Sequence, residues 1–127
     1  MVGMGRFLLV CLGGAIGSGA RYLFSTAMSR VFGNFPIGTL GVNVIGSFVI
    51  SLVMVLALDR GALGVEARLF IVAGVLGGFT TYSSFNYETL HLVQSGATGL
   101  AALNVALTLV ACLAAGLAGL WVGRLVA

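Results

Sequence analysis

Long apolar segments alternate with short stretches of charged and turn-forming residues along this sequence. Four of the segments reach the length of about 20 residues that a membrane-spanning helix needs. Turn-forming residues separate them at 33–36, 59–61 and 94–96. We therefore predict an all-α integral membrane protein, a single domain over residues 1–127, with transmembrane helices over about 4–28, 37–58, 67–92 and 97–124.

Four spans place both ends of the chain on one side of the membrane, together with the loop between the second and third spans. All six basic residues are arginines. Four lie on that side of the membrane, and the other two lie toward the opposite side: Arg6, Arg60, Arg68 and Arg124, against Arg21 and Arg30. By the positive-inside rule this small excess favours a cytoplasmic N-terminus.

The composition excludes an ordinary soluble fold. The 127 residues are 60% apolar and 7% charged, against about a quarter charged in an average soluble domain. Lipid must therefore be the main solvent of the surface. The net charge of +3 is spread along the chain, whereas a nucleic-acid-binding protein clusters its basic residues on one face. A bundle of four spans is too small to enclose a transport pathway alone.

Glycines lie four apart in three of the spans. Small residues at this spacing let helix backbones approach closely in lipid. Close packing within one bundle is the simplest interpretation of these pairs, which are Gly13 and Gly17, Gly74 and Gly78, and Gly119 and Gly123.

Polar residues recur at steps of four along the second and fourth spans, so each set forms one stripe on a helix face. Such a stripe is costly in hydrocarbon and must face protein or water. Hydrogen bonding between helices would explain the hydroxyls alone, but Asn43 carries an amide that suits a dehydrated ligand. The two stripes, which indicate a lined path, are Thr39, Asn43, Ser47 and Ser51, and Asn104, Thr108 and Cys112.

The third span contains Gly77-Gly78 and Thr80-Thr81 near its middle. These residues continue a membrane helix poorly and predict a break there. A break is tolerated at membrane depth only where it lines a cavity or binds something. It exposes carbonyl oxygens that can hold a cation and amides that favour an anion. The alternative is a kinked helix whose hydroxyls bond back to the preceding turn.

Two aromatic residues, Tyr82 and Phe85, follow the predicted break and lie on roughly one helix face. The edges of aromatic rings are positive, so rings presented edge-on stabilise a small anion without a full charge that would trap it. Packing in the protein core is the alternative for this pair.

These motifs occur in the same order in a known family. The chain resembles the Fluc (CrcB-like) fluoride channels. The resemblance implies a fluoride-specific ion channel, not an enzyme, that carries fluoride passively out of the microbial cytoplasm across the cell membrane. It also implies an antiparallel, dual-topology homodimer in lipid, with two fluoride pathways and a structural sodium ion on the twofold axis. The matching segments are Gly13–Gly17 with Arg21 and Tyr22, Gly38–Asn43 with Gly46–Phe48, and Gly77–Phe85.

Position within the family's motifs implies a role for each site residue. Gly77 and Thr80 would offer backbone carbonyls to the sodium ion. Asn43 would lie beside a fluoride ion, and Tyr82 and Phe85 would occupy the two aromatic positions of the pathway. The remaining pathway residues would be Arg21, which draws anions into the vestibule, Thr39, Ser83 and Ser84 along the path, and Glu88 near its end.

This chain departs from the family pattern at Tyr82, where phenylalanine is usual. The ring edge remains, but the hydroxyl could narrow the path or hold the ion longer. The arginine excess also favours one orientation, whereas the family inserts both ways. Because the excess is small, we expect dual insertion.

Two other functions fit a protein with four spans. A proton-coupled exporter of cationic drugs would need a carboxylate in the first span, which has none; Glu88 is the only acidic residue within a predicted span. A non-transporting subunit of a membrane assembly would use the glycines for packing only. Enzyme chemistry has little support, because His91 lacks a cluster of metal ligands and Ser83 and Ser84 lack a general base at a credible spacing.

Overall fold

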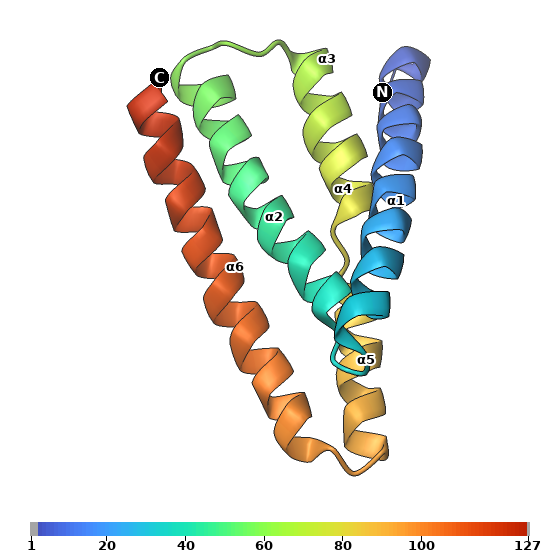
Figure 1. Ribbon diagram of the computed structural model, residues 1–127. Helices are drawn as coiled ribbons and strands as arrows, with labels where there is room; N and C mark the ends of the chain where they lie inside the picture. Colours follow the sequence, from blue (N-terminus) through green and yellow to red (C-terminus); the bar gives the residue numbers. More distant parts are fainter. Residues whose placement is uncertain (1–2, 127) are drawn as a thin grey trace.

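The computed structural model describes residues 3–126. Its four long helical spans are each long and apolar enough to cross a membrane. Each span runs antiparallel to the one before it in the chain (Figure 1). The predicted all-α class and the four spans are confirmed.

The spans are built from eight helical segments. α1 (Met4–Phe32) forms the first span, and α2 (Ile37–Met54) with the π-helical segment η1 (Val55–Asp59) forms the second. The third span joins α3 (Val65–Arg68), the π-helical segment η2 (Leu69–Leu76), α4 (Gly77–Phe79) and α5 (Tyr82–Gln94). The fourth span is α6 (Thr98–Val126). α1 thus extends beyond residue 28, where the sequence predicts its end.

Turns lie where the sequence predicts them. Gly33, Gly61 and Gly96 have φ values of 67°, 61° and 83°, in the left-handed region that glycine adopts without strain. The two ends of the described chain lie at the same end of the bundle as the loop before α3 (Figure 1), as four spans require.

Glycines allow α1 to pack directly on the third span. A Cβ atom on Gly13 would lie 2.5 Å from the Phe70 carbonyl oxygen, and one on Gly78 would lie 2.5 Å from the Gly14 carbonyl oxygen. Gly119 of α6 likewise approaches the Phe48 backbone of α2. The predicted close packing is confirmed, because no larger residue fits at these contacts without moving a backbone.

Large apolar side chains cover the outer faces of the bundle. Leu12 of α1 is 60% exposed, and Leu113 and Trp121 of α6 are 70% and 65% exposed. Side chains of this size gain about 1.5–3 kcal/mol each when they leave water. A surface of this kind is suited to lipid, and the molecule is a multi-pass membrane protein.

Candidate functional site

The third span is interrupted between α4 and α5 (Figure 1). Thr80 and Thr81 have extended backbone, with ψ values of 157° and 120°. The predicted break is therefore present, but at the threonines and not at the glycines. Gly77 is helical, with φ −61° and ψ −38°, and Gly78 lies within α4 against α1. Gly78 thus serves helix packing, and of the four residues predicted to interrupt the span, the two threonines form the break.

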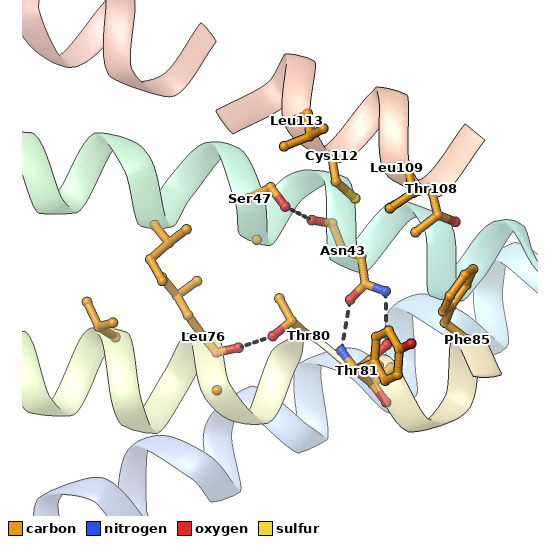
Figure 2. A pocket seen from close by; sticks show the side chains of 15 residues that line it. Asn43, Ser47, Leu76, Thr80, Thr81, Phe85, Thr108, Leu109, Cys112 and Leu113 are labelled. Atoms are coloured by element: carbon orange, nitrogen blue, oxygen red, sulfur yellow. Dashed lines mark hydrogen bonds between the residues drawn. The ribbon is translucent and has the colours of Figure 1, made fainter. Parts of the chain in front are cut away.

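Asn43 of α2 holds the break in place. Its Nδ2 donates to the Thr81 carbonyl oxygen at 2.9 Å, and its Oδ1 accepts from the Thr81 N–H at 2.8 Å (Figure 2). The amide thus replaces the backbone partners that the N–H and carbonyl of Thr81 would have in a continuous helix. Nδ2 carries two N–H donors, and the second makes no hydrogen bond within residues 3–126.

The two threonines of the break make different hydrogen bonds. The Thr80 hydroxyl donates to the Leu76 carbonyl oxygen at 2.9 Å. Thr81 begins α5 as its N-cap, and its hydroxyl oxygen accepts from the Ser84 N–H at 3.2 Å. From the sequence we predict no separate role for Thr81, although a threonine just before a helix is a typical N-cap signal.

Carbonyl oxygens remain open at the end of α4. The Thr81 N–H, which would close a helical turn onto Gly77, bonds to Asn43 instead. Within residues 3–126, the carbonyls of Gly77 and Thr80 accept no hydrogen bond from the turns, loops or side chains. They lie at the C-terminal, partly negative end of a helix.

A groove of about 460 Å³ lies beside the break, between α2, the third span and α6. We call it the central groove. Asn43, Tyr82 and Phe85 line it together with Gly77 and Thr80, so the structure brings together these five predicted site residues. The rings of Tyr82 and Phe85 lie 5.6 Å apart between centroids and are tilted by 55°. Phe85 is 9% exposed, whereas Tyr82 is 78% exposed on the open side.

The polar stripe of the fourth span divides between two environments. Thr108 and Cys112 line the central groove (Figure 2), and the buried Thr108 hydroxyl has no hydrogen-bond partner in the described part of the chain. Asn104, by contrast, is 1% exposed and donates from Nδ2 to the Thr89 hydroxyl at 2.9 Å. Only part of the fourth-span stripe therefore lines the central groove.

The stripe of the second span divides in the same way. Thr39 and Ser51 lie at its two ends. Ser51 faces α6, where its Cβ would be 3.0 Å from a Cβ added to Gly119. Ser47 lines the central groove, and its hydroxyl donates to the Asn43 carbonyl oxygen at 2.7 Å. Hydrogen bonding within a helix and packing between helices thus account for part of this stripe.

A second, more polar hollow of about 280 Å³ lies between α1, α2 and α5. Arg21, Thr39, Ser84 and Glu88 line it, and Thr81 borders both this hollow and the central groove. The Thr39 hydroxyl donates to Glu88 Oε1 at 2.8 Å, while the buried Glu88 Oε2 has no hydrogen-bond partner among residues 3–126. Apart from Ser83, the predicted site residues thus fall into two groups, and Thr81 borders both.

Ser83 belongs to neither hollow of the single chain. It is exposed, and its hydroxyl lies 3.4 Å from that of Thr81. Among residues 3–126 there is no group of three or more histidine, cysteine, aspartate or glutamate side chains that could hold a metal ion. A cation near the break would therefore depend on backbone carbonyls.

Comparison with known proteins identifies the family. The family described as CrcB-like protein, Camphor Resistance (CrcB), matches residues 8–120. A protein of Anaeromyxobacter dehalogenans named "Fluoride-specific ion channel FluC" is 57% identical over 91% of this chain and 92% of its own. Proteins of the same name from Agrobacterium fabrum and Thermus thermophilus are 50% and 53% identical, over 91% and 80% of this chain and 94% and 80% of their own. The chain belongs to the CrcB-like protein family.

Proposed function

We propose that this protein is a fluoride-specific ion channel that carries fluoride passively out of the cytoplasm across the cell membrane. The observation that carries the proposal is the 57% identity, over nine-tenths of both chains, to a protein named as such a channel. The other relatives carry the same name.

The central groove has the chemistry that a weakly held anion needs. Asn43 retains one N–H donor, Thr108 a buried hydroxyl without a partner, and Phe85 a ring in the groove wall. Amide and hydroxyl donors and the positive ring edge attract an anion. None carries a full charge, so the ion also leaves readily, as conduction requires. Arg21 in the second hollow would raise the anion concentration beside Ser84 and Thr39.

The functional unit in this proposal is an antiparallel homodimer with two pathways. Two properties of the single chain support it. First, the central groove is open on the side where Tyr82 is 78% exposed. Second, the Thr108 hydroxyl in the groove lining has no hydrogen-bond partner within residues 3–126. A second copy would supply the missing wall.

A sodium ion is part of the same proposal. The carbonyl oxygens of Gly77 and Thr80 fit this hard cation, because they are free of hydrogen-bond donors and lie at the negative end of α4. A sodium ion would supply fixed positive charge between the two copies. Thr80→Ala is expected to leave sodium-dependent dimer stability unchanged, since the ligand is a backbone carbonyl. Loss of that dependence, measured by thermal unfolding in sodium and in potassium, would assign the ligand to the hydroxyl.

Fluoride release from liposomes tests the function directly. Purified protein is reconstituted into liposomes loaded with potassium fluoride, and an electrode measures fluoride outside after valinomycin is added. Rapid, valinomycin-dependent release is expected from proteoliposomes and not from protein-free liposomes. Release that occurs equally in both, or in neither, would refute the proposal. Replacing internal fluoride by chloride tests the specificity.

A further inference from the structure

Asn104 is a buried amide outside both hollows. It is 1% exposed and is one of the two largest fully buried side chains in the described structure. An amide without a partner in such surroundings would cost about 1–3 kcal/mol. The Nδ2 group meets this need through the Thr89 hydroxyl at 2.9 Å. This is the one side-chain hydrogen bond between α5 and α6 within residues 3–126.

The Thr89 hydroxyl has one proton and can therefore donate only one hydrogen bond. It donates to the Phe85 carbonyl oxygen, one turn earlier in α5, at 2.7 Å. The oxygen lone pairs are then free to accept from Asn104. These two hydrogen bonds, which we call the relay, connect α6 through Thr89 to the backbone of Phe85. The Phe85 ring lines the central groove.

The relay and the Asn43 bonds hold the same segment at two points. Asn43 ties Thr81, at the start of α5, to α2. Asn104 ties Thr89 to α6, about 12 Å further along the helix at 1.5 Å per residue. Tyr82 and Phe85 lie between these two points. A rotation of α5 about its own axis would move these two rings relative to the groove. Such a rotation requires that the hydrogen bonds of Asn43 or that of Asn104 break.

We propose that Asn104 is a positioning residue for the anion pathway, which sets the rotation of α5 through Thr89 and thereby the presentation of the Phe85 ring. This inference rests on the proposed fluoride channel function. Asn104 does not touch the ion.

Substitution of both ends of the bond tests the proposal. Asn104→Leu keeps the branched shape and removes the donor, and Thr89→Val removes the hydroxyl. Each is expected to lower fluoride flux per folded protein about fivefold, the factor expected for one hydrogen bond of about 1 kcal/mol. Each is also expected to lower the ratio of fluoride to chloride permeability. Thr89→Ser keeps the hydroxyl and should restore both quantities.

The double variant and a control on the same helix complete the test. If the two residues act through one bond, the double variant conducts as either single variant does. Ser95→Ala removes a hydroxyl at the C-cap of α5 that bonds back to the Leu92 carbonyl oxygen and makes no hydrogen bond to α6 within residues 3–126, and it should conduct as wild type.

Several outcomes would overturn the positioning role. Wild-type flux and selectivity in Asn104→Leu would do so, as would effects that multiply in the double variant, or an equal loss in Ser95→Ala. If Asn104→Leu fails to fold, Thr89→Val and Thr89→Ser decide the question without changing α6. Wild-type proteoliposomes are measured first, so that the absence of any fluoride release refutes the channel function itself.

Discussion

Asn43 is the residue on which the geometry of the broken span depends. In hydrocarbon, a backbone N–H or carbonyl without a partner costs several kcal/mol, and a break releases both. Asn43 supplies a partner to each of these groups on Thr81, at 2.8 and 2.9 Å. The same side chain also lines the central groove. Its role is therefore both to stabilise the break and to offer its remaining N–H to an anion.

Asn43→Ala is expected to lower fluoride flux more than tenfold, because it removes two hydrogen bonds of about 1 kcal/mol or more each and the donor in the groove. Dimer yield should fall less than flux. Flux is measured per folded protein in liposomes, after size-exclusion chromatography. Equal flux at equal protein would contradict both assigned roles of the amide.

Tyr82→Phe is expected to retain fluoride flux within about twofold, since Tyr82 is 78% exposed on the open side of the groove and the ring edge is kept. Phe85→Ile removes the ring edge in the groove wall and should lower flux strongly. Both are compared in the same liposome measurement, with chloride release recorded in parallel. A loss of selectivity in Tyr82→Phe would give the hydroxyl a direct part in ion choice.

At the scale of the elements, contact between α1 and the third span depends on backbone atoms meeting without side chains between them. Gly13 and Gly78 each face a carbonyl of the opposite helix at a distance that no Cβ allows. This contact holds η2 and α4 in place, so that the open carbonyls and the break have a rigid support. Helix packing of this kind is driven by van der Waals contact in lipid.

Gly78→Ala is expected to destabilise the folded protein by about 1–3 kcal/mol, the range for overpacking a tight contact. Gly14→Ala is the matched control, because a Cβ at Gly14 meets nothing within 4 Å. Thermal unfolding of the detergent-solubilised protein should show a lowered midpoint for Gly78→Ala alone. Equal midpoints would mean that the helices separate at little cost.

At the scale of the whole molecule, few charges determine how the chain inserts. Six arginines and three acidic residues are distributed over the whole chain. Arg124 lies in the last turn of α6 and Arg60 directly after η1, and these helix ends lie at the end of the bundle that holds both termini (Figure 1). Arg30 lies in the last turn of α1, at the opposite end. Because insertion follows the difference in basic residues between the two sides, single substitutions can shift it.

Two opposite biases test the antiparallel arrangement. Arg30→Gln favours a cytoplasmic N-terminus, and the double variant Arg60→Gln with Arg124→Gln favours the reverse. Each expressed alone is expected to lose most of its fluoride flux, because copies of one orientation cannot form antiparallel pairs. Co-expression of both should restore flux. Full activity of each variant alone would contradict a requirement for both orientations.

Local composition determined much of this protein by itself. The sequence predicts the four spans, the turns at Gly33, Gly61 and Gly96, and the approximate place of the break. It does so because hydrocarbon excludes charges and unpaired backbone groups, whichever helix packs beside them. Resemblance of motifs indicated the family, which the comparisons confirm. The assigned roles of single site residues remain predictions.

Only the tertiary structure decided which polar groups meet. The bond between Asn43 and Thr81 joins residues 38 apart in sequence, and that between Asn104 and Thr89 depends on how α6 lies on α5. The same packing placed Gly78 against α1, confined the break to Thr80 and Thr81, and divided both polar stripes. Periodicity places a residue on a helix face, but the neighbouring helix determines what that face meets.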